Sequence, residues 1–168
     1  KEEAEWVEIR KLKTVYEQAL SNNQLDQLEP YLAKNFRGVV FTGEELKSFA
    51  EVKTYHGKIR ELIGAGGTYQ VKVNHAPGTM LGDVAIAHGD TDEQVTTGGG
   101  KKYSFKTLWT VNLVKEAGSW KIFRLQASLD PLDNVFVQDT VRMVQLTFGI
   151  GGALGGALLA AVILKLKK

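Results

Sequence analysis

Two polar side chains near the middle of this sequence, His88 and Asp90, have the types and the spacing for acid–base chemistry. They alternate along a predicted strand, so both side chains lie on the same face of it. If that face lines a pocket, the imidazole would act as a base beside a neighbouring acid. If the face is turned to solvent, both are ordinary surface residues of a sheet. The sequence alone leaves the two alternatives open.

Metal and nucleophile chemistry have no comparable pattern. The chain has no cysteine, which excludes disulfides and thiolate chemistry. Its three histidines, His56, His75 and His88, share no ligand spacing such as H-x-x-x-H. The glycine-rich segment 64–67 follows a predicted helix, whereas a phosphate-binding loop precedes one. We therefore expect no metal and no cofactor, and the net charge of +2 is too small to indicate a nucleic-acid partner.

The elements that must position these residues begin with helices. Apolar residues recur at steps of three and four from Trp6 to Leu20, which predicts an amphipathic helix. A second, short helix is predicted over 25–32. A third is predicted over 44–63, because Thr42 with Glu45 three residues later has the spacing of a capping box.

Strands dominate the next part of the chain. One strand is predicted before the third helix, and the alternation of apolar and polar residues predicts four more from Tyr69 onward. The predicted strands are 36–42, 69–73, 84–91, 103–113 and 120–128. Glu116-Ala117-Gly118-Ser119 has the composition of a hairpin turn between the last two. Helices followed by consecutive strands predict an α+β domain with one curved antiparallel sheet and the helices packed on one face.

Three segments carry a resemblance to a known family. They are YEQALSNNQLDQLEPYLAKNF at 16–36, GDVAIAHGD at 82–90 and GSWKIFRLQAS at 118–128. In this order and spacing, over about residues 6–128, they resemble the nuclear transport factor 2-like superfamily, close to its SnoaL-like branch. The resemblance implies a cone-shaped domain whose curved sheet wraps a pocket or a packed core and often dimerises.

The resemblance implies little about activity, because the fold hosts isomerases, dehydratases, cyclases and non-catalytic assembly modules. Enzymes of the superfamily generally place a carboxylate or a histidine in the cone, with a Tyr or Asp donor for a developing oxyanion. The polar and aromatic residues considered for such a pocket are Tyr55, His56, His88, Asp90, Asp92, Tyr103, Trp109, Arg124 and Gln126. The pocket candidates taken forward are His88, Asp90, Tyr55 and Arg124.

The end of the chain has the composition of a membrane-spanning helix. Residues 143–164 carry no charge and are followed by a basic tail at 165–168. A spanning helix needs about 20 predominantly apolar residues, and this run is long enough. The alternative is a buried helix or a flexible glycine-rich tail, although a helix of a water-soluble domain would normally show a polar face. We expect a domain at 1–128, a connector at 129–142 and a single transmembrane helix at 143–164.

Small residues form stripes along the predicted span and favour close contact between helices. The helix-packing residues are Gly151, Gly152, Gly155, Gly156 and Ala160. The partners expected are the lipid bilayer and other transmembrane subunits or copies of the same chain. Because the flanking positive charges lie on the C-terminal side, we expect a cytoplasmic C-terminus and an extracytoplasmic domain. A tail-anchored protein with a cytosolic domain is the rival topology.

Two functions fit the sequence. The preferred one is a non-catalytic, single-pass accessory or assembly subunit of a membrane complex, which docks through its glycine-rich helix and its domain. The other is a membrane-tethered, SnoaL-like protein that binds a small apolar ligand, or an enzyme of the isomerase, dehydratase or cyclase type. The two differ in whether the cone is filled by the aromatic side chains of Trp109, Phe105 and Tyr16, or holds a cavity of a few hundred cubic ångströms that contains His88 or Asp90.

Overall fold

The computed structural model describes residues 2–130, 134–135, 138–139 and 142, and the chain divides into two units at residues 130 and 131. The first unit contains the domain. Its helical elements are α1 (Glu2–Ser21), the 3₁₀ helix η1 (Leu25–Tyr31) and α2 (Phe49–Ile63). Its strands are β1 (Leu32–Val39), β2 (Glu45–Leu46), β3 (Thr68–His75), β4 (Thr79–Leu81), β5 (Val84–Thr96), β6 (Lys102–Glu116) and β7 (Ser119–Ser128).

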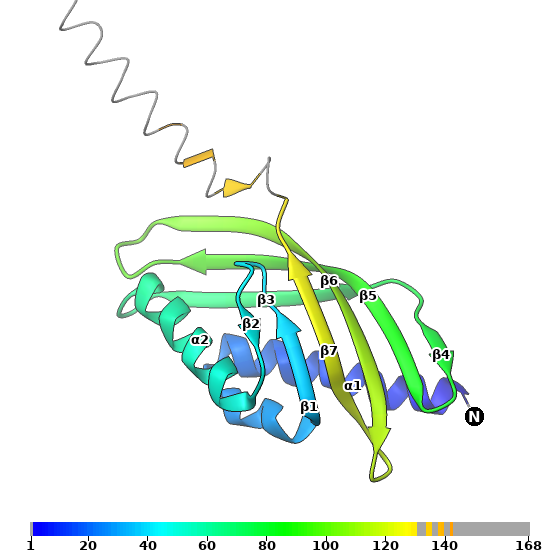
Figure 1. Cartoon of the computed structure of the whole chain (residues 1–168). Helices are drawn as coiled ribbons and strands as arrows, with labels where there is room; N and C mark the ends of the chain where they lie inside the picture. Colours follow the sequence, from blue (N-terminus) through cyan, green and yellow to red (C-terminus); the bar gives the residue numbers. More distant parts are fainter. Residues whose placement is uncertain (1, 131–133, 136–137, 140–141, 143–168) are drawn as a thin grey trace, which may run out of the picture. The chain divides into compact units, whose positions relative to one another are not determined.

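The strands form one seven-stranded mixed sheet with the order β2-β1-β7-β6-β5-β3, and β4 pairs with β5. The long strands β5 and β6 bend, and α1 and α2 lie against one face of the sheet (Figure 1). The α+β class is therefore confirmed, but the prediction of an antiparallel sheet is wrong at one place. β1 and β7 run parallel, with Gly38 opposite Leu125. β5, β6 and β7 follow one another in the sequence and pair antiparallel. β1, in contrast, lies near the start of the sequence and pairs with the last strand, β7.

The predicted hairpin between β6 and β7 is present. Ala117 and Gly118 have positive φ angles of 49° and 79°. Two consecutive residues with positive φ are the signature of a type I′ turn, whose twist matches that of the flanking strands. This turn fixes the register of the two strands and places Trp120 opposite Lys115.

The third helix was predicted to begin at residue 44, and this is wrong, because α2 begins at Phe49. Ser48 caps α2, and its hydroxyl accepts a hydrogen bond from the Glu51 backbone N–H at 3.3 Å. The Glu51 carboxylate in turn accepts a hydrogen bond from the Lys47 backbone N–H at 2.7 Å. Ser48 and Glu51 thus have the same three-residue spacing as Thr42 and Glu45, and they lie next to the helix. Glu45 instead belongs to β2, which pairs with β1.

The core consists of two apolar clusters, each joining α1 to the sheet. In one, Ala19 and Leu20 of α1 pack with Tyr69 and Val71 of β3. In the other, Ile9 and Leu12 of α1 pack with residues of β5, β6 and β7, including the fully buried Leu113. The face of the sheet covered by the helices is called the inner face below, and the opposite one the outer face.

No helix within the described part of the chain is long and apolar enough to cross a membrane. The predicted span at 143–164, with Gly151, Gly152, Gly155, Gly156 and Ala160, lies outside the described residues. It stays a prediction from the sequence.

Candidate ligand-binding cavity

A cavity of about 440 Å³ lies between the helices and the inner face of the sheet. Its wall on the helical side comes from α1, η1 and α2, with Ile9, Leu28 and Val52 among the lining residues. Its other wall comes from the sheet, where β1, β2, β3, β5, β6 and β7 all contribute residues. Tyr16 and Trp109 line the space without filling it, so the interior of the domain is open.

Alternation along β5 decides which of its side chains reach the cavity. Ala87, Thr91 and Glu93 line the cavity, and all three are buried. Their neighbours at even positions point to the outer face, as the two-residue period of a strand requires. The cavity wall along β5 therefore changes from alanine at one end to a carboxylate at the other.

Glu93 is the centre of the polar part of the cavity. The residue is only 4% exposed, and both carboxylate oxygens accept hydrogen bonds from hydroxyl groups. The Tyr69 hydroxyl donates to Oε2, and the Thr91 hydroxyl donates to Oε1 at 2.7 Å. Glu93, Tyr69 and Thr91 are called the Glu93 cluster below. These bonds satisfy a carboxylate that would otherwise be costly to bury.

Three tyrosine hydroxyls surround this carboxylate and stay protonated at neutral pH. Burial and the charge of Glu93 raise the pKa of Tyr16. Burial raises the pKa of Tyr69 well above its ordinary value, with Tyr16 and Glu93 adding to the effect. Burial also raises the pKa of Tyr55, whose oxygen accepts a hydrogen bond of 3.5 Å from the Thr42 hydroxyl. The tyrosines are therefore hydrogen-bond donors, and none of them is a base near neutral pH.

His56, which also lines the cavity, joins α2 to the end of α1. Its Nε2 atom lies 2.9 Å from Oδ1 of Asn23, and an amide oxygen only accepts, so Nε2 carries the proton. Burial, followed by the nearby Arg60 guanidinium, lowers the pKa of the imidazole. The ring is therefore neutral at pH 7 and holds the turn at Asn23, whose φ is 56°.

Two of the four predicted pocket residues, His88 and Asp90, lie on the outer face of β5. His88 is exposed, and Asp90 accepts hydrogen bonds of 3.0 Å from both Asn74 and Lys106. The reason is the parity of β5, in which the odd-numbered residues face the cavity. Neither side chain contributes to the cavity wall. The prediction that these two residues lie in the pocket is therefore wrong, and both are surface residues.

The other two predicted residues differ from each other. Tyr55 lines the cavity, as expected. Arg124 does not line it, and its guanidinium donates to the Asn35 carbonyl at 2.8 Å and stacks 3.7 Å from the centroid of the Phe123 ring. A bulge at Phe123 shifts the register, because Leu113 pairs with Ile122 whereas Asn112 pairs with Arg124. Arg124 therefore shares the outer face with Asn112.

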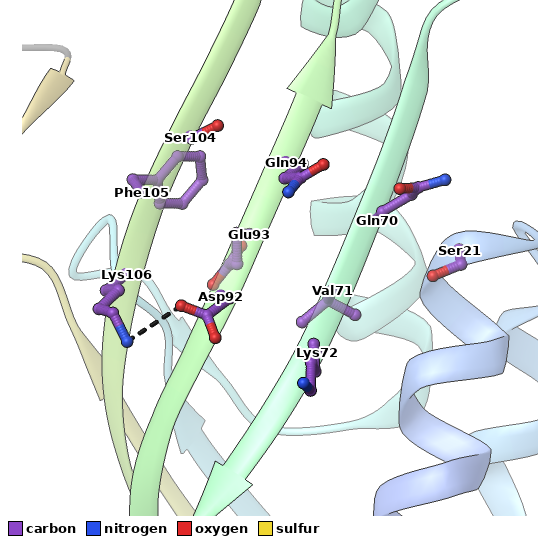
Figure 2. Close-up of a pocket in the computed structure, with 10 residues that line it drawn as sticks. All are labelled: Ser21, Gln70, Val71, Lys72, Asp92, Glu93, Gln94, Ser104, Phe105 and Lys106. Atoms are coloured by element: carbon purple, nitrogen blue, oxygen red, sulfur yellow. Dashed lines mark ion pairs between the residues drawn. The ribbon is translucent and has the colours of Figure 1, made fainter.

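The outer face carries an open groove across β3, β5 and β6 (Figure 2). Lys106 forms ion pairs of 3.0 Å with both Asp90 and Asp92, and Asn74 donates to both carboxylates. Hydrogen bonds from Asn74 and Lys106 lower the pKa of both aspartates. These exposed groups satisfy one another, which is typical of a solvated sheet surface.

The Glu93 cluster was missed by reasoning from the sequence. One signal for it was present, because the alternation of Tyr69, Val71 and Val73 predicts an inward face on β3. Val71 pairs with Glu93 across the antiparallel ladder, so the two share that inner face. Finding the carboxylate thus required the β3–β5 register, which the sequence does not supply. Within the described part of the chain, no group of three or more His, Asp or Glu residues is arranged to hold a metal ion.

A sequence model of the SnoaL-like domain matches residues 9–132 of the chain, and no curated protein matches it. Solved structures agree on the fold. A conserved protein from Planctomyces limnophilus has a TM-score of 0.67 at 11% identity, covering 77% of this chain and 99% of that one. A protein with a cystatin-like fold from Caulobacter vibrioides has a TM-score of 0.61 at 14% identity, covering 83% and 99%.

A nuclear transport factor 2-like protein of unknown function from Pseudomonas putida has a TM-score of 0.59 at 19% identity, covering 79% of this chain and 90% of that one. At these identities the similarity shows the fold alone. Function has to be argued from the cavity.

Proposed function

The chain belongs to the SnoaL-like domain family, and from this premise we propose that its domain binds a small, largely apolar molecule in the cavity. The observation that carries the proposal is the open interior of about 440 Å³. Ligand pockets of proteins are typically about 300–1,000 Å³, mostly apolar, with a few polar groups that orient the ligand. The cavity has this composition, since aliphatic and aromatic side chains surround one polar cluster.

The volume limits the size of the ligand. About 440 Å³ lies near the lower end of the range of about 300–1,000 Å³ that ligand pockets span, so the cavity takes a small ligand. A molecule with one or two fused rings, or a chain of similar volume, fits this space. Longer lipids would have to leave part of their length outside.

The geometry favours binding over turnover. An enzyme of the isomerase, dehydratase or cyclase type would need a base that is available to the substrate. Glu93 is the buried carboxylate of the cavity, and both of its oxygens already accept hydrogen bonds from Tyr69 and Thr91. These contacts support a role in fixing the shape and polarity of the cavity.

The test is to reduce the volume of the cavity without changing the Glu93 cluster. Ala87→Leu adds three carbon atoms to the inner face, and we expect the fluorescent probe N-phenyl-1-naphthylamine to bind at least about tenfold more weakly, because several buried methylene equivalents are excluded. The measurement is a fluorescence titration of the full-length chain against a protein-free blank in the same buffer.

His88→Leu is the matched control, because the same side chain is placed one residue further along on the exposed outer face. We expect it to bind the probe like the unchanged protein, and both variants to melt cooperatively by circular dichroism. If the unchanged protein does not bind the probe, or both variants bind it equally well, the proposal fails.

We also propose that residues 143–164 anchor this binding domain in a membrane and dock against partner helices. The support is the uncharged run itself and the glycine stripes at 151/155 and 152/156. On this proposal the chain is a single-pass accessory subunit that presents a ligand-binding domain to a membrane complex.

Deleting 143–168 is expected to move the chain from the carbonate-resistant membrane pellet into the supernatant. The double substitution Gly152→Leu and Gly156→Leu should leave the chain in the pellet but weaken its association with partner helices. Crosslinking in native membranes measures this association. Unchanged crosslinking would contradict docking through this stripe, and a supernatant location of the full chain would contradict the span.

A further inference from the structure

Two polar atoms in the wall of the cavity, the Thr107 hydroxyl and the Trp109 indole N–H, have no hydrogen-bond partner within the described part of the chain. Both residues lie on β6, two positions apart, so both point to the inner face. Thr107 is only 3% exposed. Buried polar groups in proteins are nearly always paired, so two unpaired ones in one cavity wall require an explanation.

Neither atom has a hydrogen-bond partner among its cross-strand neighbours. Thr107 pairs with Thr91 across the ladder, but the Thr91 hydroxyl donates its proton to Glu93. Trp109 pairs with Gly89, which has no side chain to offer. Ala87 and Val111 lie on the same face and are apolar, and His75 of β3, which pairs with Gly89, also lines the cavity.

We infer that the ligand carries a neutral hydrogen-bond acceptor, a carbonyl oxygen, which faces β6 and receives hydrogen bonds from Trp109 Nε1 and Thr107 Oγ1. This inference rests on the proposed function and names the chemistry of its ligand. An indole N–H only donates, so its partner has to be an acceptor. A pure hydrocarbon would leave both donors unpaired.

The charges around the cavity indicate that the acceptor is neutral. Glu93 forms no ion pair within the described residues, so its charge disfavours an anion beside it. The two cations of the lining, Arg10 and Lys13, are each paired with a glutamate of α1 itself, at Glu3 and Glu17. Ketones, quinones, lactones and esters of suitable volume fit these conditions, whereas carboxylates do not.

The experiment compares two probes that differ in one atom. 2-Acetylnaphthalene has a carbonyl oxygen where 2-isopropenylnaphthalene has a methylene group, and the two have nearly the same shape. In the full-length chain, Thr107→Val and Trp109→Phe should each weaken binding of the ketone roughly threefold to tenfold, the usual range for one neutral hydrogen bond. Binding of the hydrocarbon should change less than about twofold.

Thr107→Val removes an unpaired hydroxyl and keeps the shape of the side chain, so the variant should fold at least as stably as the unchanged protein. Thr110→Val is its matched control, because it makes the same change on the exposed outer face of β6. A second measurement follows the indole protons by NMR. The Trp109 signal, identified by its loss in Trp109→Phe, should move downfield with the ketone and stay nearly unchanged with the hydrocarbon.

Three outcomes are distinguishable. Selective loss of ketone binding in Thr107→Val and Trp109→Phe supports the inference. If the unchanged protein binds both probes and the two variants bind the ketone as well as it does, the inference is overturned while the proposed function stands. If the unchanged protein binds neither probe, the proposed function is overturned and the inference with it.

Discussion

Replacement of Gly89 by alanine is expected to destabilise the domain by about 3 kcal/mol or more, although only one methyl group is added. Gly89 pairs with His75 across the β3–β5 ladder. A Cβ atom at Gly89 would lie 2.0 Å from the Asn74 carbonyl oxygen and 2.9 Å from the His75 Cα. These are backbone atoms held by the sheet, so they cannot move aside as a flexible side chain would.

The consequence should reach the cavity as well as the stability. The segment after His75 leads into Ala76, Pro77 and Gly78, all of which line the cavity. Forcing β3 away from β5 at Gly89 would displace this part of the wall. A domain of this size loses about 2–4 °C of melting temperature per kcal/mol, so a decrease of about 10 °C is expected by circular dichroism.

Gly57→Ala is the matched control, with the same chemical change and the opposite expected sign. Gly57 lies inside α2, is exposed, and has no atom within 4 Å of an added Cβ. Alanine is favoured over glycine in a helix interior by about 1 kcal/mol, so this variant should melt at a higher temperature. Equal melting temperatures for the Gly89 and Gly57 variants would contradict the close β3–β5 approach.

Much of the fold follows from local patterns in the sequence. The spacing of apolar residues predicts α1, the alternation after Tyr69 predicts the sheet, and Ala117-Gly118 predicts the hairpin. These are local signals, because each depends on residues close together in the chain. The parallel pairing of β1 with β7 has no such signal, since it joins the two ends of the domain. The start of α2 was misplaced because two capping-box spacings occur six residues apart, and only the pairing of β2 decides between them.

The candidate site is harder to predict, because it depends on which face of the sheet each strand residue occupies and on the register between strands. His88 and Asp90 have suitable chemistry, but the even positions of β5 face outward. Glu93 has equally suitable chemistry and lies one position out of phase with them. Its partner Tyr69 comes from another strand, 24 residues away in sequence. The alternation of a strand predicts two faces and not which of them meets the helices.

The Glu93 cluster should behave as one energetic unit, and a double-mutant cycle measures this directly. Glu93→Leu leaves the Tyr69 hydroxyl buried without an acceptor and the Thr91 hydroxyl with only the Thr107 carbonyl at 3.4 Å, and we expect it to lower the free energy of unfolding by about 3 kcal/mol. Tyr69→Phe removes one donor from the carboxylate and should cost about 1–2 kcal/mol. Urea denaturation of the full-length chain measures both changes.

The double variant is the decisive member of the cycle. Once Glu93 is leucine, the Tyr69 hydroxyl is an unpaired buried group, and replacing it with phenylalanine removes that penalty. The loss in free energy of unfolding of the double variant should therefore be smaller than the sum of the two single losses by about 1 kcal/mol or more. Additive effects, within about 0.5 kcal/mol, would contradict a shared hydrogen bond. Gln94→Leu, on the exposed outer face beside Glu93, is the control and should change stability by less than about 0.5 kcal/mol.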